Sequence, residues 1–232
     1  MANKPKKSQK VDTKKVSKVD ICQTPPHAIE PLLPYLKKEW WIWESAAGPE
    51  KILANALGKQ GYIVHATDLL YDEKYNYFTY NPAFHYDIEI TNMPFSIKYA
   101  WLKKAFERGR RFCLIAPYET TFAKEFQKLF KQYNGYPAPD GNPYYGRWFI
   151  EVLSPERRIA FKMPDMGWGK YVYNEKTQSM QWRDSSAQMP TCWITWGLQI
   201  DKVLQSNTEY LRTYYVPMRS TKYDKNNQEI KK

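Results

Sequence analysis

The tetrapeptide Asn92-Met93-Pro94-Phe95 holds residue types that could bind and activate a planar amine. It directly follows Ile88-Glu89-Ile90-Thr91, a run typical of a strand. An exocyclic amine on a nucleobase is a weak nucleophile, because its lone pair is delocalised into the ring. An Asn oxygen and a neighbouring backbone carbonyl can accept both amine hydrogens, proline fixes the turn, and an aromatic ring can stack on the base. We therefore expect Asn92 to be the acceptor and Phe95 the stacking platform, with the carbonyl supplied by one of the two residues between them. On its own, the tetrapeptide favours a strand-to-loop turn that buries its Phe over an amine-binding site.

A stretch of small residues follows an earlier strand-like run. Residues 40–43 are apolar, and Glu44-Ser45-Ala46-Ala47-Gly48 comes directly after them. Small side chains at Ala46 and Gly48 let backbone N–H groups approach a ligand closely. The carboxylate of Glu44 is expected to receive an ammonium group of that ligand, directly or through water.

An acidic residue, Asp68, ends the next strand-like run, at residues 62–66. Ligands of parallel sheets bind beyond the carboxyl ends of the strands. We therefore expect Asp68 to face the same crevice as Gly48 and Asn92. Its carboxylate is suited to ribose hydroxyls, a role that acidic residues play in dinucleotide sites.

Strand-like runs alternate with helical spacing over the first part of the chain, which predicts βαβ units and a largely parallel sheet. Helices are expected from residue 24 to 36, 52 to 58, 97 to 108 and 121 to 132, with a fourth strand at 112–117. Three later runs, at 148–153, 158–162 and 192–198, indicate further strands. The predicted fold class is α/β: a mostly parallel sheet with helices on both faces, and a small lobe rich in loops and strands after residue 134.

The order of these motifs resembles that of the amino-group methyltransferases of nucleic acids, in particular the compact DNA adenine methyltransferases of phages and prophages. Their Asn/Asp-Pro-Pro-Tyr/Phe motif is similar to Asn92-Met93-Pro94-Phe95, with Met93 in place of the first proline. Family members often have a Thr-Pro-Pro segment, as at Thr24-Pro25-Pro26, ahead of a Glu-Pro-Ala-Cys/Ala-Gly-x-Gly loop, which here reads from Glu44 to Glu50. The resemblance covers roughly residues 22–200.

The resemblance implies a class I methyltransferase (Rossmann-like) fold and S-adenosylmethionine as the cofactor. It implies transfer of a methyl group to an exocyclic amine of a nucleic-acid base, adenine N6 in DNA, with no metal and no covalent enzyme intermediate. The catalytic residues would be Asn92, Met93, Pro94 and Phe95, and the cofactor-binding residues Thr24, Pro25, Glu44, Ala46, Gly48, Asp68 and Asn76.

Three positions depart from the family pattern. Glu50 stands where a second glycine is usual, so its side chain either crowds the cofactor or points outward. Asn76 lies about where the family has an acidic residue beside the adenine ring, and Met93 removes the stiffness of a Pro-Pro pair. Two alternatives therefore stay open: the same fold acting on RNA or on a protein amide, and a catalytically degenerate protein that binds nucleic acid or cofactor.

Charge is concentrated in the expected tails of this 232-residue chain, whose formal net charge is +11. Residues 1–20 carry seven lysines against two aspartates and are expected to be a disordered basic tail. The methyltransferase domain is expected at 21–200, with target-recognition insertions within 134–192, followed by a C-terminal extension with a basic tail at 201–232. The tails either confer solubility or attract a phosphate backbone.

A target-recognition face is one interpretation of the later half of the chain, and a solvated rim over an aromatic core is the other. Cations and aromatic residues interleave there: Arg147, Arg157, Arg158, Lys162, Lys170 and Arg183 with Tyr144, Tyr145, Trp148, Trp168 and Trp182.

The three cysteines and three histidines have no metal-ligand spacing, so no metal site is expected. No apolar run approaches the ~20 residues of a membrane span, and the lysine-rich start lacks the apolar core of a secretory signal. The chain is expected to be cytoplasmic, in a bacterium or a phage-infected cell, with nucleic acid and no membrane as its partner.

Overall fold

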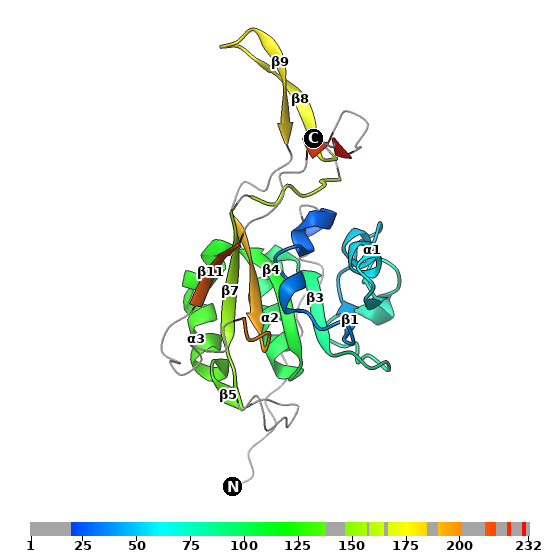
Figure 1. The fold of residues 1–232 in the computed structure, drawn as a ribbon, viewed down its shortest axis with the longest axis vertical. Helices are drawn as coiled ribbons and strands as arrows, with labels where there is room; N and C mark the ends of the chain where they lie inside the picture. Colours follow the sequence, from blue (N-terminus) through cyan, green and yellow to red (C-terminus); the bar gives the residue numbers. More distant parts are fainter. Residues whose placement is uncertain are drawn as a thin grey trace.

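A seven-stranded sheet forms the centre of the computed structural model, which describes residues 20–137, 147–156, 158–164, 167–184, 190–200, 212–216, 222–223 and 229–230. The strand order is β11-β7-β10-β4-β3-β1-β2 (Figure 1). Only β10 runs antiparallel to its neighbours β4 and β7, among the strands described for this sheet. The strands are β1 (Trp41–Glu44), β2 (Ile63–Ala66), β3 (Ile88–Asn92), β4 (Arg111–Pro117), β7 (Ile150–Pro155), β10 (Thr191–Trp196) and β11 (Arg212–Val216).

Helices cover both faces of this sheet. Leu53 and Leu57 of α1 (Ile52–Lys59) pack in one core cluster with Ile29 of the 3-10 helix η3 (Pro26–Ile29) and with Ile42 of β1. Buried residues of α2 (Lys98–Glu107) and α3 (Lys124–Tyr133) belong to a second cluster on the other side. The mostly parallel sheet between two helical layers is a Rossmann-like α/β fold, so the fold class predicted from the sequence is confirmed.

Short hairpins make up the predicted strand-rich additions. They are β5 (Tyr136–Pro137) with β6 (Arg147–Trp148), β8 (Gly169–Asn174) with β9 (Ser179–Asp184), and β12 (Lys222–Tyr223) with β13 (Glu229–Ile230). Figure 1 shows β8 and β9 extending away from the central sheet. The basic tail expected at residues 1–20 lies outside the described residues, except for Asp20.

Three expectations about elements need correction. The helix expected at 24–36 is two 3-10 helices, η3 and η4 (Leu33–Tyr35), because prolines interrupt the N–H series there. The strand expected at 158–162 is reduced to isolated bridge residues, among them Lys162, which pairs with Gln23. The sheet also extends past residue 200, since β11 pairs in parallel with β7.

The chain reverses its direction of travel across the sheet at β1. From β1 it passes through α1 to β2 on one side, and β3 then pairs with β1 on the other side. Such a switch point opens a crevice at the carboxyl ends of the strands, which is where ligands of open α/β sheets bind. This places the crevice between the ends of β1 and β3.

Candidate functional site

A cavity of about 350 Å³ lies at the carboxyl ends of β1, β2 and β3. It brings together residues that are far apart in the sequence. Of the residues proposed from the sequence, Ala46, Gly48, Asp68, Asn76, Asn92 and Pro94 line it.

The loop after β1 forms one wall of this cavity, the loop wall (Ser45, Ala46 and Gly48). The Ala46 backbone N–H donates to Thr91 Oγ1 of β3 at 3.1 Å. Gly48 has a φ of +64°, and a Cβ built on it would lie 1.9 Å from Gln23 Nε2. Glycine is therefore required at this position by both backbone conformation and space.

Asp68 closes the loop wall from the side of β2. Its carboxylate accepts the Gly48 N–H at 2.8 Å and the Leu70 N–H at 2.7 Å. The Tyr71 hydroxyl donates to the Gly48 carbonyl. Each carboxylate oxygen of Asp68 retains a second lone pair, so the residue fixes the loop and still lines the cavity.

Glu44 lies beneath the loop wall and does not line the cavity. It is 2% exposed, and its Oε2 has no hydrogen-bond partner among the described residues. Burial raises the pKa of this carboxyl to about 8; the backbone N–H of Ala54 opposes the shift and the charge of Asp68 adds to it. Glu44 is thus a buried acid that is mostly neutral at pH 7.

Asn92, at the end of β3, lines the cavity and carries a buried acceptor atom. Its Nδ2 donates to Cys22 Sγ at 3.5 Å. Its Oδ1 is buried without a hydrogen-bond partner among the described residues. A buried polar atom without a partner costs free energy, so a ligand donor such as an N–H would be favoured there.

The other three residues of the tetrapeptide separate. Pro94 lines the cavity, with φ at −58°. The Met93 side chain is 1% exposed and packs in the cluster that contains Trp101. The Phe95 ring is not part of the cavity lining and packs edge-on against Phe161, 6.3 Å between centroids, so the stacking surface lies elsewhere than expected.

Aromatic residues that were not predicted from the sequence also line the cavity. Tyr77 stacks on Trp101, with 3.7 Å between ring centroids and 5° between planes, and we call this pair the aromatic wall. Phe78 and Tyr75 also line the cavity. Asn76 lies among them, and its Oδ1 accepts the Phe78 N–H at 3.1 Å. The aromatic richness of residues 71–86 was visible in the sequence, but nothing in the spacing showed which rings would face a ligand.

Residues 20–23, the N-terminal strap, cover the rim. Asp20 accepts the backbone N–H groups of Phe95 and Ser96, at 2.8 and 3.3 Å, and the Ser96 hydroxyl at 2.6 Å. Gln23 exchanges two backbone hydrogen bonds with Lys162, both at 2.9 Å. Thr24 and Pro25, which were assigned to the cofactor, are buried behind the strap and do not line the cavity.

Glu50 points outward. Its carboxylate pairs with Lys162 Nζ at 2.6 Å, and its side chain is 46% exposed. It does not line the cavity, so a side chain at this position does not crowd the loop wall.

The aromatic residues of the expected recognition face divide between core and undescribed positions. Trp148 and Trp168 are 1% and 5% exposed, so they belong to the core. Tyr144, Tyr145 and Arg157 lie outside the described residues, as do the side chains of Lys170, Trp182 and Arg183.

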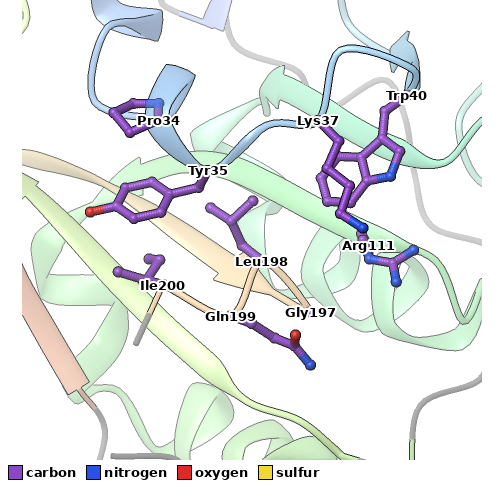
Figure 2. A pocket seen from close by; sticks show the side chains of 9 residues that line it. All are labelled: Pro34, Tyr35, Lys37, Trp40, Arg111, Gly197, Leu198, Gln199 and Ile200. Carbon is purple, nitrogen blue, oxygen red and sulfur yellow. The ribbon is translucent and has the colours of Figure 1, made fainter. Parts of the chain in front are cut away.

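A second cavity, of about 240 Å³, lies at the opposite, amino edge of the sheet (Figure 2). Its cationic part is formed by Lys37 and Arg111, which lie 5.8 and 5.1 Å from the ring centroid of Trp40. Leu198 and Ile200 line its apolar part, on the turn after β10. Every cavity-lining residue predicted from the sequence lies at the other edge, which is therefore the candidate site.

Two absences hold for the residues that the structure describes. No group of three or more His, Cys, Asp or Glu side chains is arranged to hold a metal ion. None of the helices in those segments has the length and apolar character needed to traverse a bilayer.

Comparison with solved structures returns methyltransferases at low similarity. A protein described as a class I S-adenosylmethionine-dependent methyltransferase, from Listeria monocytogenes, is 15% identical, with a TM-score of 0.46; the match covers 87% of this chain and 68% of that one. An S-adenosylmethionine-dependent O-methyltransferase from Thermotoga maritima is 13% identical (TM-score 0.39; 73% and 63% covered). A tRNA (m1A58) methyltransferase from Aquifex aeolicus is 12% identical (TM-score 0.34; 73% and 66% covered).

The chain thus spans about two thirds of the length of these proteins. All three TM-scores lie below 0.5, so the fold assignment rests on the sheet order and not on this likeness. No protein-family model and no curated protein matches the sequence.

Proposed function

We propose that this chain transfers the methyl group of S-adenosylmethionine to an exocyclic amine of a nucleic-acid base, adenine N6 in DNA. The observation that carries the proposal is Asn92, which lines a cavity at the switch point of the sheet and whose Oδ1 is a buried acceptor without a partner among the described residues. An amine hydrogen is the donor that such an acceptor binds best without adding charge.

The cavity suits the proposed cofactor in its residue types. The loop wall offers backbone groups and a glycine with positive φ, Asp68 offers carboxylate lone pairs for hydroxyls, and Tyr75 and Phe78 offer rings beside a planar base. When bound, S-adenosylmethionine supplies an electrophilic methyl group on a sulfonium. The cavity volume of about 350 Å³ lies within the range of small-molecule sites.

The residues of this chain would act by position and by hydrogen bonding. Asn92 Oδ1 would accept one amine hydrogen and a backbone carbonyl of the following residues the other, which would increase the electron density on the nitrogen. As the nitrogen–methyl bond forms, the sulfur–methyl bond would break, the cofactor would leave as a neutral thioether, and the amine would lose one proton to solvent. Pro94 holds the turn that places this carbonyl. Such positioning is a large source of rate enhancement.

Nucleic acid is the substrate class favoured by charge, since the chain carries +11 and residues 1–20 carry seven of its lysines. The motif order Thr24-Pro25-Pro26, Glu44 to Gly48 and Asn92 to Phe95 favours DNA adenine within that class. RNA and protein amides offer the same amine chemistry, so they are the substrates against which DNA must be tested.

One observation favours a second candidate, a protein that binds nucleic acid without methyl transfer. The Gln23 side chain packs against Gly48, and both oxygens of Asp68 already accept backbone N–H groups. A cofactor that approaches the Gly48 backbone would need the Gln23 side chain to move. A chain that never releases the strap would bind nucleic acid and not the cofactor.

Tritium transfer from labelled S-adenosylmethionine to DNA, RNA and protein, run beside calorimetry with the cofactor, separates these functions. The proposal expects cofactor binding and label in DNA. Label confined to RNA or protein would change the substrate, and no binding at millimolar cofactor would leave the second candidate.

A further inference from the structure

Glu89 is a buried carboxylate directly below the candidate site. It lies in β3, three residues before Asn92, and is 2% exposed. Its Oε1 accepts the Ser45 hydroxyl at 2.6 Å and the Trp101 indole N–H at 3.4 Å. Its Oε2 accepts the Tyr77 hydroxyl at 3.1 Å.

The three donors come from three different elements and all line the cavity. Ser45 belongs to the loop wall, while Tyr77, from the segment between β2 and β3, and Trp101, from α2, form the aromatic wall. One carboxylate therefore ties the two walls together. Apolar contacts are non-directional, whereas these three hydrogen bonds fix where each wall stands.

The groups around Glu89 stabilise a hydrogen-bond acceptor. Arg108 follows α2; its Nη2 donates to the carbonyls of Tyr77 and Tyr80 at 2.7 and 2.9 Å, and its guanidinium lies 4.8 Å from the Tyr77 ring centroid. Burial raises the pKa of Glu89, while the three hydrogen bonds and the charge of Arg108 oppose that rise.

We propose that Glu89 is a positioning residue for cofactor binding: it sets the separation of the loop wall and the aromatic wall, and thereby the affinity of the cavity for S-adenosylmethionine. This inference rests on the proposed function. It assigns no contact between Glu89 and the reacting atoms.

The test is a double-mutant cycle of Glu89→Gln and Tyr77→Phe, with the cofactor Kd measured by calorimetry and kcat measured at saturating cofactor. Glutamine has one acceptor oxygen in place of two, and phenylalanine keeps the ring while removing one donor. Tyr62→Phe is the control, because Tyr62 is also buried but donates its hydroxyl to the Leu36 carbonyl and does not line the cavity.

Each single variant is expected to raise the cofactor Kd by about tenfold, the size of one missing hydrogen bond to a charged group. The double variant should cost no more than the worse single variant, because both changes break the same bond. The kcat at saturation should stay within about threefold, and Tyr62→Phe should leave Kd unchanged. If Glu89→Gln does not fold, the comparison of the cofactor Kd of Tyr77→Phe with that of Tyr62→Phe is the test.

Unchanged Kd in the variants, beside a wild type that binds the cofactor, would overturn the role of Glu89 and leave the proposed function intact. Additive effects of the two changes on Kd in the double variant, or a loss in kcat with unchanged Kd, would also overturn the role of Glu89. A wild type that does not bind S-adenosylmethionine would overturn both the proposed function and the role.

Discussion

At the scale of single residues, Asn92 combines three properties that a generic turn residue lacks. It ends a strand at the switch point, it lines the cavity, and one of its polar atoms is buried without a partner among the described residues. Its amide orientation follows from Cys22, whose sulfur accepts the Nδ2 hydrogen. That hydrogen bond engages the donor end of the amide, so Oδ1 is the end that a substrate amine would have to reach.

Replacing Asn92 with alanine should lower kcat by about 100-fold or more, because the loss of one positioned hydrogen-bonding group in a catalytic site typically costs that much. The cofactor Kd should change less than threefold, since the backbone of β3 is unaltered. Asn55→Ala, on the exposed side of α1, is the control and should have full activity. Undiminished methyl transfer by Asn92→Ala would contradict the assigned acceptor role.

Glu44 gives the chain a pH-dependent stability. Its pKa is about 8 in the folded protein and near 4.5 when unfolded, so the folded state binds more protons between these values. The free energy of unfolding should therefore fall as pH rises from 4.5 to 8, by the order of 1 kcal/mol per pH unit. Glu44→Gln should flatten this slope, as measured by urea denaturation at pH 5, 6.5 and 8. An equal slope in wild type and variant would refute this assignment.

Residue types and spacing predicted only part of the site. Gly48, Asp68 and Asn92 could be placed because each directly follows a recognisable strand, and strand ends meet at one edge. The direction of the Phe95 ring and the contacts of Glu89 depend on residues such as Phe161 and Ser45, which lie 66 and 44 positions away in the sequence. No local pattern encodes such pairs.

At the scale of elements, the loop after β1 and the helix α1 make opposite demands on glycine. Gly48→Ala should destabilise the protein by roughly 1–3 kcal/mol, because the residue has positive φ and the added Cβ would meet Gln23. Gly58→Ala in α1 should stabilise it by roughly 0.5–1 kcal/mol, since an added Cβ meets nothing within 4 Å. Urea denaturation midpoints of the two variants test both predictions. An unchanged midpoint for Gly48→Ala would show that the strap moves aside at no cost in the free energy of unfolding.

Elements were predictable where a run is both long and apolar. The strands β1 to β4 were found within one or two residues of their ends, and α1, α2 and α3 within three. The run at 158–162 has strand-like composition, but it forms isolated bridges, such as Lys162 with Gln23, and no strand. Whether a strand forms depends on a partner strand beside it, and the partner is a property of the tertiary structure.

At the scale of the whole molecule, the order of the strands was the least accessible feature. The antiparallel strand β10 lies between β4 and β7, although 35 residues separate Pro155 from Thr191. Alternating runs predict a parallel sheet but give no rule for inserting one reversed strand. The position of the site could be predicted without the full strand order, because it depends on β1, β2 and β3 alone.

The basic tail should act through charge rather than through a fixed docking geometry. Asp20 lines the cavity, so residues 1–19, with seven lysines and one aspartate, join the chain at the rim of the site. Replacing the seven lysines with glutamine should weaken DNA binding at low salt. It should also reduce the slope of log binding constant against log salt concentration by about 0.9 for each phosphate that the tail no longer neutralises.

Replacement of the seven lysines with arginine is the control and should preserve both the affinity and the slope. An unchanged salt slope after the glutamine replacement would show that the tail does not bind phosphates.

The central claim is that this chain methylates a base amine using the acceptor Asn92. Its most direct test is mass spectrometry of nucleosides from DNA and RNA after expression in a host that lacks base methylation, with Asn92→Ala expressed in parallel. The account predicts N6-methyladenine in DNA with the wild type, reduced about 100-fold or more with Asn92→Ala. No methylated base in either nucleic acid, or equal methylation by both proteins, would contradict it.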